Sequence, residues 1–343
     1  MDAIVVSQFG GPDSLKQGRA DRPSFRPNQM IVRVAACGVC GHDLLNRAGQ
    51  FASTRLPAIL GHEIAGTVDE IGALVSRFKI GDRVALMQRQ PCGVCRSCRD
   101  GRENLCRSGD GFYGEQTPGG YGQFVAASER NAVLLPIEIP FHIGAVLSCA
   151  VGTGFRALLR AGVHVGDMVV ITGASGGVGI NTVQIARLMG LSTIAITASD
   201  SKIDVLRAAG ADHVIVAPTF KFHDQVRALS AGKEGAAAVI EITGAPTFNS
   251  SIRALRPGGR MVLVGNVDPG NVALNPAVAI LKEIELIGSA HAVLADLRQI
   301  VDLVKIKRLL PIIAATMPVE EAAAAHRKME NRSTVGRIVL THG

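Results

Sequence analysis

The chain has no tryptophan and only two tyrosines among its 343 residues. Proteins that bind single-stranded nucleic acid stack the bases on aromatic side chains, and this sequence offers few of them. Its formal charge of +7 comes from Lys and Arg that are dispersed rather than gathered in basic runs. We therefore expect no nucleic-acid partner.

Export and membrane signals are also missing. The N-terminus carries an acid, Asp2, and has no long apolar core, so it does not resemble a secretory signal. The uncharged run 168–186 has the length of a membrane-spanning helix, but glycines and polar residues interrupt it. We expect a cytoplasmic protein with no membrane association.

The seven cysteines form an odd set in a chain without an export signal. This argues against a disulfide scaffold and for metal or thiol chemistry. Four of them have the spacing C-x2-C-x2-C-x7-C within residues 91–107: Cys92, Cys95, Cys98 and Cys106. Bacterial ferredoxins continue the first three with C-x3-C-P, which is absent here. Four thiolates suit tetrahedral Zn²⁺, and such closed sites are structural, so we predict a zinc lobe.

Two styles of hydrophobic pattern divide the chain near residue 150. Short β-branched or alternating segments between glycines and prolines predict strands, and we expect a barrel. These segments are 4–9, 30–39, 63–72 and 82–87. Later, strands at 168–173, 192–197, 213–217, 237–243 and 260–265 alternate with helical segments such as 176–190 and 199–210. This alternation predicts an α/β domain with a parallel sheet. A helix over 318–333 and a strand over 335–341 follow.

A glycine motif lies between the first of those later strands and the helix after it. Gly173, Gly176 and Gly179 have the spacing G-x-x-G-x-x-G. Glycines here let the backbone approach a pyrophosphate, and the N-terminus of the helix attracts its negative charge. The sequence therefore predicts a dinucleotide site.

The end of the next strand bears on which dinucleotide binds. An NAD site carries an acid there for the ribose 2′-hydroxyl, whereas this chain has Thr197, Ala198 and Ser199. Ser199, Ser201 and Lys202 offer partners for a 2′-phosphate. Asp200 argues the other way, because it could repel a phosphate or bind a ribose. We expect NADP(H) in preference to NAD(H).

Several motifs occur together in the order typical of one family. They are GVCGHD (38–43), GHE (61–63), KIGDRV (79–84), the four-cysteine lobe, GASGGVG (173–179) and VGRIVL (335–340). From end to end the chain resembles the zinc-dependent alcohol dehydrogenases of the medium-chain dehydrogenase/reductase superfamily. The resemblance implies a GroES-like β-barrel catalytic domain over 1–149 and 291–343, which includes the zinc lobe. It implies a doubly wound Rossmann domain over 150–290.

The resemblance also implies roles for individual residues. Cys40, His62 and Cys149 correspond to the ligands of a catalytic Zn²⁺, which leaves an open position for a substrate oxygen. Asp43 corresponds to the carboxylate that orients the ligand histidine, and Glu63 to an acid beside the metal. The lobe cysteines correspond to a second, structural zinc. The residues expected at the dinucleotide are Thr153, Gly173, Ser175, Gly176, Gly177, Val178, Gly179, Thr197, Ser199, Lys202, Gly265 and Asn266.

One position departs from the family pattern. Alcohol dehydrogenases have Ser or Thr two residues after the first zinc cysteine, where the hydroxyl starts a proton relay, and this chain has His42. His42 could replace the relay as proton shuttle, bind an anionic or larger substrate, or serve as a structural hydrogen-bond donor. Phe51, Phe112 and Leu294 are candidates for the wall of the substrate pocket.

The leading expectation is a zinc-dependent oxidoreductase that transfers hydride between NAD(P)(H) and an alcohol, aldehyde or ketone. The segments GASGGVGI and AILKEIELIG are also similar to acryloyl-CoA reductases. NADPH-dependent reduction of an activated double bond, of the acryloyl-CoA or enoyl-CoA type, is therefore the alternative. The resemblance further implies a small-molecule substrate and a homodimer or homotetramer.

Overall fold

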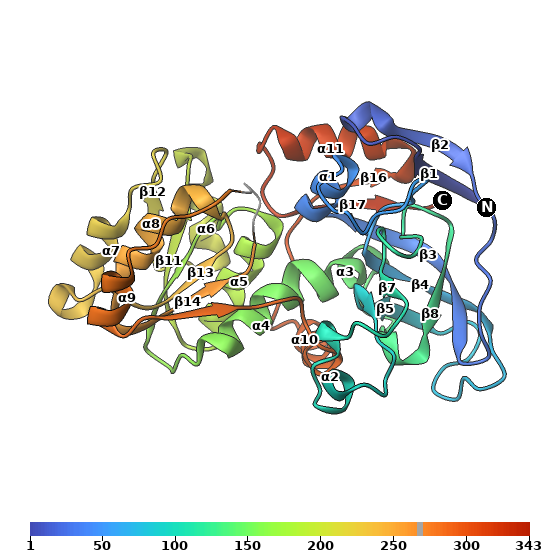
Figure 1. Cartoon of the computed structure of the whole chain (residues 1–343), viewed down its shortest axis with the longest axis horizontal. Helices are drawn as coiled ribbons and strands as arrows, with labels where there is room; N and C mark the ends of the chain where they lie inside the picture. The colour runs from blue at the N-terminus through green and yellow to red at the C-terminus, as the bar shows by residue number, and fades with distance from the viewer. Residues whose placement is uncertain (266–269) are drawn as a thin grey trace. The chain divides into compact units, whose positions relative to one another are not determined.

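The computed structural model describes residues 1–265 and 270–343 and divides the chain into two compact units. The first unit consists of Met1–Gly152 and His291–Gly343, and the second of Thr153–Ala290. Both ends of the chain therefore belong to the first unit, and the second is inserted between them (Figure 1).

A seven-stranded sheet organises the first unit. Its order is β16-β17-β3-β4-β5-β9, and β8 pairs with β3 beside this path. All these pairs are antiparallel except β16–β17. The strands are β3 (Gln29–Val39), β4 (Glu63–Ile71), β5 (Arg83–Leu86), β8 (Phe124–Ser128), β9 (Ala132–Leu134), β16 (Ile313–Pro318) and β17 (Arg337–Thr341). Two small sheets accompany it: β1 (Asp2–Val6) with β2 (Leu15–Arg19), and β6 (Arg89–Gln90) with β7 (Gly111–Phe112).

The long strand β3 contacts three strands, β4, β8 and β17. Most of its residues are therefore buried and apolar. Met30, Val32 and Val34 on one of its faces are almost fully buried in the core of this unit. A strand enclosed in this way needs apolar, β-branched side chains. Helices of the first unit are α1 (Gly41–Arg47), α2 (Arg96–Arg99), α3 (Phe141–Val146), α10 (Leu294–Lys305) and α11 (Ala322–Glu330).

Among the described residues, one helical run is long and apolar enough to cross a membrane. It extends over Phe141–Ala161 and comprises α3, a π-helical turn (Leu147–Val151) and α4 (Gly152–Ala161). Because 78% of its apolar window is buried inside the protein, these side chains contribute to the protein interior. The uncharged run 168–186 forms instead a strand, β10 (Met168–Ile171), and most of a helix, α5 (Gly177–Leu188).

The second unit is built on a six-stranded sheet in which every pair is parallel. The order is β12-β11-β10-β13-β14-β15, so the first strand of the unit lies at the centre and the order reverses there. The strands are β10 (Met168–Ile171), β11 (Ser192–Thr197), β12 (His213–Val216), β13 (Ala236–Glu241), β14 (Leu255–Leu263) and β15 (Glu285–Gly288). This is the strand order of the Rossmann fold, and it confirms the predicted doubly wound sheet.

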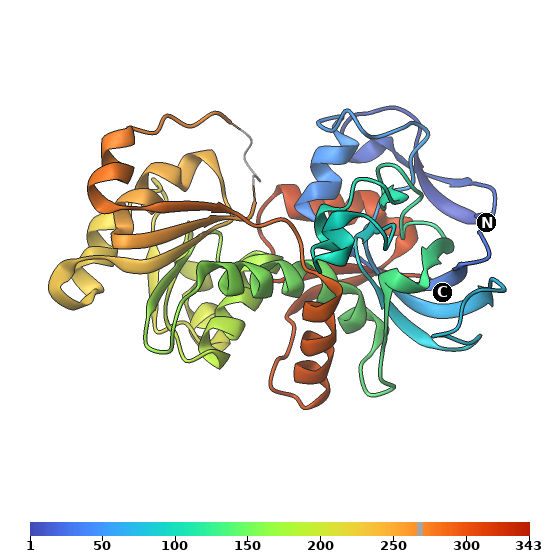
Figure 2. The same cartoon turned by 60° about the horizontal axis from the view of Figure 1, so that its bottom comes forward.

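Helices cover both faces of this sheet (Figure 2). They are α5 (Gly177–Leu188), α6 (Ile203–Ala209), α7 (His223–Leu229), α8 (Ala245–Ala254) and α9 (Pro276–Lys282). With helices on both faces, the central strands have few contacts with water and become almost wholly apolar. In β13, all six residues are buried.

The one acid in β13, Glu241, joins two strand ends. Its carboxylate accepts hydrogen bonds from Thr172, Thr243, Gly244, Thr247 and Ser251. A buried carboxylate needs such a full set of donors. Thr172 follows β10, Thr243 and Gly244 lie between β13 and α8, and Thr247 and Ser251 lie in α8. Glu241 therefore fixes the loops on both sides of the point where the strand order reverses, which is where Rossmann sheets bind their ligands.

In the first unit, a tight turn at Gly61 precedes β4. Gly61 has φ of +95°, and a Cβ there would lie 2.6 Å from both the Cys37 Sγ and the Tyr121 ring. Both neighbours are fully buried, so neither has room to withdraw. The turn therefore requires glycine for its backbone conformation and for its packing.

Replacing this glycine should destabilise the protein. We expect Gly61→Ala to lower the free energy of unfolding by about 2 kcal/mol or more, because it combines backbone strain with overpacking. Thermal unfolding should then occur roughly 4 °C lower or more. Gly41→Ala is the matched control, since a Cβ there meets no atom within 4 Å. Equal melting temperatures for the two variants would contradict this account of the turn.

Candidate active site

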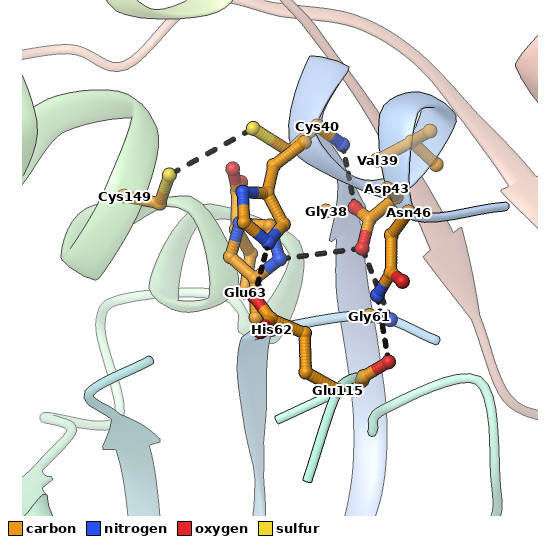
Figure 3. A network of polar contacts seen from close by, with 12 residues as sticks. Gly38, Val39, Cys40, Asp43, Asn46, Gly61, His62, Glu63, Glu115 and Cys149 are labelled. Carbon is orange, nitrogen blue, oxygen red and sulfur yellow. Dashed lines mark hydrogen bonds and ion pairs between the residues drawn. The ribbon is translucent and has the colours of Figure 1, made fainter. Parts of the chain in front are cut away.

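Four side chains that can bind metal meet in the first unit. Cys40 follows β3, His62 precedes β4, Glu63 begins β4, and Cys149 lies in the π-helical turn. One ligand atom from each lies within 4.8 Å of all the others. The two sulfurs, Cys40 Sγ and Cys149 Sγ, are 3.9 Å apart (Figure 3). Two thiolates bound to one tetrahedral zinc at about 2.3 Å are themselves about 3.8 Å apart, so the geometry fits this ion.

Local structure explains why these residues converge. The antiparallel register of β3 and β4 pairs Gly38 with Glu63, which brings Cys40 beside His62. Gly38 is required at that pair, because a Cβ would lie 2.2 Å from the Glu63 carboxylate. A π-helical turn is rare and occurs often at functional sites; here it carries Cys149.

Asp43 orients the histidine. It is fully buried, and its Oδ1 accepts hydrogen bonds from His62 Nδ1 and the Gly61 N–H, each at 3.2 Å. Its Oδ2 accepts one from the Cys40 N–H at 2.9 Å and so caps α1. Burial opposes ionisation, but the His62 ring lowers the pKa of Asp43 below its ordinary value. Because Nδ1 carries the proton, the lone pair of Nε2 remains for a metal.

Glu63 is buried beside the same group. Arg337 NH2 lies 3.0 Å from its Oε1, and Arg337 NH1 donates to the Val39 carbonyl. Burial raises the pKa of Glu63 to about 7, although the charge of Arg337 opposes this shift. Since Arg337 engages the Glu63 carboxylate, the donor set that remains is Cys40, His62 and Cys149. A tetrahedral ion on three protein ligands keeps one open position.

His42 lies next to this group, and its partner is a carboxylate rather than a backbone carbonyl. Its Nε2 is 2.7 Å from Glu115 Oε1, and Ser53 donates to the other oxygen of Glu115. Burial opposes ionisation of Glu115, but the hydrogen bonds from His42 and Ser53 lower its pKa to about 2. The His42 ring stacks on Phe51, with centroids 4.3 Å apart.

Phe112 and His291 complete a group of rings at this place. Phe112 lies 4.9 Å from His42 and 5.1 Å from His291 between centroids. Burial lowers the pKa of His291 to about 4, so this ring is neutral near pH 7. The third residue suggested for the pocket wall, Leu294, is the first residue of α10, and its N–H donates to Glu103.

The sequence did not indicate Glu115 or His291 as functional residues. Glu115 lies in a loop of the composition GEQTPGG, and His291 immediately follows Ala290 at the return to the first unit. Neither position belongs to a motif with periodicity or ligand spacing. Only the fold brings them to His42 and Phe112.

The four cysteines predicted to form a zinc lobe also come together. The Sγ distances are 3.5 Å for Cys95–Cys98, 3.8 Å for Cys95–Cys106 and 4.0 Å for Cys92–Cys98. These bracket the roughly 3.8 Å expected around one tetrahedral zinc. Backbone N–H groups of Val94 and Cys95 lower the pKa of the Cys92 thiol to about 6. At Cys92 this favours the thiolate, the form that binds metal, whereas burial raises the pKa of Cys98 to about 12.

In the second unit, the glycine motif turns from β10 into α5. Gly173 has φ of +56°, and Gly176 is the N-cap of α5. A Cβ on Gly179 would lie 2.3 Å from the Gly173 carbonyl oxygen. The loop is therefore closely packed against the start of α5, and the N-terminus of a helix favours an anion such as a phosphate.

Several of the remaining residues expected at the cofactor lie at or after the carboxyl ends of the strands. Thr197 ends β11, Ser199 Oγ bonds to Ser201 Oγ at 2.8 Å, and Lys202 precedes α6. Gly265 follows β14, and a Cβ there would lie 2.3 Å from the Ile242 carbonyl oxygen. Further residues expected there are Ser175, Gly177 and Val178 in the turn into α5 and Thr153 in α4. Asn266 lies outside the described residues.

Comparison with known proteins, over 99% of the chain, assigns it to the family that its sequence motifs resemble. Residues 26–137 match the alcohol dehydrogenase GroES-like domain, and residues 177–305 match the zinc-binding dehydrogenase domain. The acryloyl-coenzyme A reductase of Metallosphaera sedula is 33% identical over 99% of this chain and 100% of its own. An alcohol dehydrogenase of Geobacillus stearothermophilus is 31% identical over 99% of each chain. The crystal structure of AibC has a TM-score of 0.93 and 41% identity, covering 100% of this chain and 96% of that one.

These matches confirm the predicted GroES-like and Rossmann domains. They also place the two cysteine-containing clusters in a family of zinc-binding dehydrogenases. The chain is an oxidoreductase that belongs to the alcohol dehydrogenase family of the medium-chain dehydrogenase/reductase superfamily.

Proposed function

We propose that the protein is a zinc-dependent oxidoreductase that transfers hydride between a nicotinamide dinucleotide and an alcohol, aldehyde or ketone. One observation carries the proposal. Two sulfurs 3.9 Å apart and an imidazole held by a buried carboxylate surround one point, and the nearby Glu63 is paired with Arg337. Three donors with an open position are the pattern of a catalytic zinc site.

When bound, the ion supplies Lewis acidity toward a substrate oxygen, and the nicotinamide donates or accepts the hydride. The chain holds and orients these groups. Cys40, His62 and Cys149 serve as ligands, and Asp43 keeps His62 in the tautomer that presents Nε2. Arg337 offsets the charge that Glu63 carries beside the ligands when it is ionised.

We propose that His42 is the polar side chain that meets the substrate in place of the usual hydroxyl. Its Nε2 is engaged with Glu115, so Nδ1 is the nitrogen that can contact a substrate. In this arrangement Glu115 fixes the tautomer and the tilt of the ring, and Phe51 supports one face. The predicted role of His42 as proton shuttle would be carried out at Nδ1.

Reduction of an activated double bond in a thioester is the second candidate. It is supported by the replacement of the family hydroxyl with the His42–Glu115 pair, and by relatives that are acryloyl-coenzyme A reductases. In that reaction hydride goes to the β-carbon, and the donors of the site would bind the conjugated carbonyl.

A substrate panel with matched variants tests the function. We expect the wild-type protein to oxidise NADPH or NADH with aldehydes or ketones, and less with acryloyl-CoA. His62→Ala should lower kcat/KM roughly a thousandfold or more, since the Lewis acid contributes several kcal/mol. Cys37→Ala is the control, because Cys37 is buried outside the ligand group.

Two results would contradict the leading proposal. Preferential turnover of acryloyl-CoA would favour the second candidate. Full activity of His62→Ala, or of protein freed of zinc, would exclude a metal-assisted mechanism of either kind.

We further propose two zinc ions per chain, one at Cys40, His62 and Cys149 and one at the four lobe cysteines. The lobe lies in a segment with few buried apolar residues and short elements, α2 and a 3₁₀ turn at Glu103–Leu105. A closed four-thiolate ion contributes folding free energy in such a segment. Its proposed role is structural.

For the dinucleotide we propose NADP(H). The end of β11 carries Thr197 rather than an acid, and Ser199, Ser201 and Lys202 follow it within one turn. A hydrogen-bonded ion pair with a 2′-phosphate is worth about 1.5–3 kcal/mol. Asp200 is also in this turn and remains the residue that could instead favour NAD(H).

Steady-state kinetics with both cofactors tests this preference. We expect a lower KM for NADPH than for NADH, and a rise of roughly tenfold in the KM for NADPH in Lys202→Ala. The KM for NADH should change little in that variant. Lys233→Ala, in the turn after α7, is the control. A wild-type protein that prefers NADH would overturn the proposal.

Finally, we propose that two copies of the chain associate through the edge of the second unit. β15 ends the sheet and pairs only with β14 among the described residues. Apolar side chains near this edge are exposed, with 71% for Ile280, 84% for Leu281 and 39% for Leu286. An unpaired edge with an apolar surface is a site for strand pairing with another chain.

A charge on the edge should disrupt this association. We expect the wild-type protein to be a dimer or a larger even oligomer by light scattering, and Leu286→Arg to dissociate it. Leu229→Arg, which replaces a leucine 40% exposed on α7, should leave the oligomer intact. A monomeric wild-type protein, or equal dissociation of both variants, would contradict the proposal.

A further inference from the structure

A buried polar network lies at the end of α1 opposite to Cys40. It joins Arg47, the last residue of α1, to His326 in α11 and to Tyr121 before β8; we call these three residues the His326 clamp. His326 and Tyr121 are completely buried, and Arg47 is 3% exposed. The helix α11 lies next to α1 in the first unit (Figure 1). Buried polar groups of this kind are costly unless all of them are hydrogen-bonded.

The hydrogen bonds determine the state of the histidine. Arg47 NH1 lies 3.0 Å from His326 Nδ1, and a guanidinium can only donate. Nδ1 therefore accepts, and Nε2 carries the proton and donates to the Tyr121 hydroxyl at 2.9 Å. Burial also lowers the pKa of His326 to about 4, which agrees with a neutral ring. A neutral imidazole is thus both acceptor and donor between two fixed partners.

One end of the clamp reaches Cys40 through α1. The helix has seven residues, with Cys40 as N-cap, Asp43 in its first turn and Arg47 at its end. Besides His326, Arg47 donates to the Gly10 carbonyl at 3.0 Å and to Glu330 of α11. So short a helix is not stable by itself, and its position depends on contacts at both ends.

The other end of the clamp reaches His62. The Tyr121 N–H donates to the Leu60 carbonyl at 3.0 Å, and its ring packs so closely on Gly61 that no Cβ could be accommodated there. The next residue is His62. Tyr121 therefore determines where the turn that carries this imidazole lies.

We propose that His326 is a positioning residue of the metal centre. From its place in α11 it holds Arg47 and Tyr121 together and so fixes the distance between Cys40 and His62. The inference rests on the proposed zinc function of these ligands. The hydrogen bonds of His326 go to Arg47 and Tyr121, and neither of these is a ligand. It acts through α1 on one side and through the Gly61 turn on the other.

A residue that merely stabilises the first unit would act differently. It would lower the melting temperature and weaken both metal sites alike, because both belong to the same unit. A positioning residue weakens only the site whose ligands it places. The four-thiolate lobe is therefore an internal reference for metal binding at Cys40, His62 and Cys149.

The experiment measures metal retention at the two sites separately. Zinc is counted in the full-length protein, and each site is titrated with a chelator after replacement by Co²⁺, whose absorption spectrum differs between two-sulfur and four-sulfur coordination. We expect His326→Phe to lower metal affinity at Cys40, His62 and Cys149 roughly tenfold or more, as loss of a supporting partner does. The lobe should retain its affinity.

Two further variants test the hydrogen bonds and guard against a failure to fold. In His326→Gln the amide can accept from Arg47 and donate to Tyr121, so we expect metal affinity near that of the wild-type protein. Tyr121→Phe removes one bond only and should give an intermediate loss. Phe78→Ala, a buried core position between β4 and β5, controls for destabilisation and should affect the two metal affinities alike.

The outcomes separate this inference from the proposed function. A wild-type protein that binds no metal outside the lobe would overturn the zinc function itself. If the wild-type protein binds two ions, equal loss at both sites in His326→Phe and Tyr121→Phe would overturn the positioning role. Unchanged affinity in both variants would overturn it as well.

Discussion

The carboxylate of Asp43 is the constraint on which the candidate active site depends. Three hydrogen bonds converge on it, from the Cys40 N–H, the Gly61 N–H and His62 Nδ1. They connect the start of α1 to the turn before β4, two segments that are separate in the sequence. Since both oxygens are used and the group is fully buried, the side chain has one orientation, and it fixes those of its partners.

Other parts of the first unit, farther from Asp43, also hold the site residues in place. The register of β3 with β4 brings the two segments together, the π-helical turn adds Cys149, and Arg337 from the last strand pairs with Glu63. The second unit has a similar arrangement, in which the buried carboxylate of Glu241 joins the loops after β10 and β13. In both units a buried carboxylate with a full set of donors holds the loops that carry the chemistry.

Much of the fold could be predicted because its signals are local. The parallel sheet follows from strands alternating with helices, and the glycine loop from three residues between β10 and α5. Short elements such as α1, β9 and β16 were not predicted, because Gly41 and Pro318 lie in or next to them and only tertiary contacts stabilise them. Pairs such as His42 with Glu115, or His326 with Arg47, are 73 and 279 residues apart. No periodicity or spacing connects such residues, and only the fold does.

The central claim is that one metal ion binds to Cys40, His62 and Cys149. Anomalous diffraction from crystals of the full-length protein, at wavelengths on both sides of the zinc absorption edge, tests it most directly. The account predicts a zinc peak about 2.3 Å from both sulfurs and about 2.0 Å from His62 Nε2, with no bond to Glu63. A map without a peak there in zinc-replete protein, or with Glu63 as a permanent fourth ligand, would contradict it.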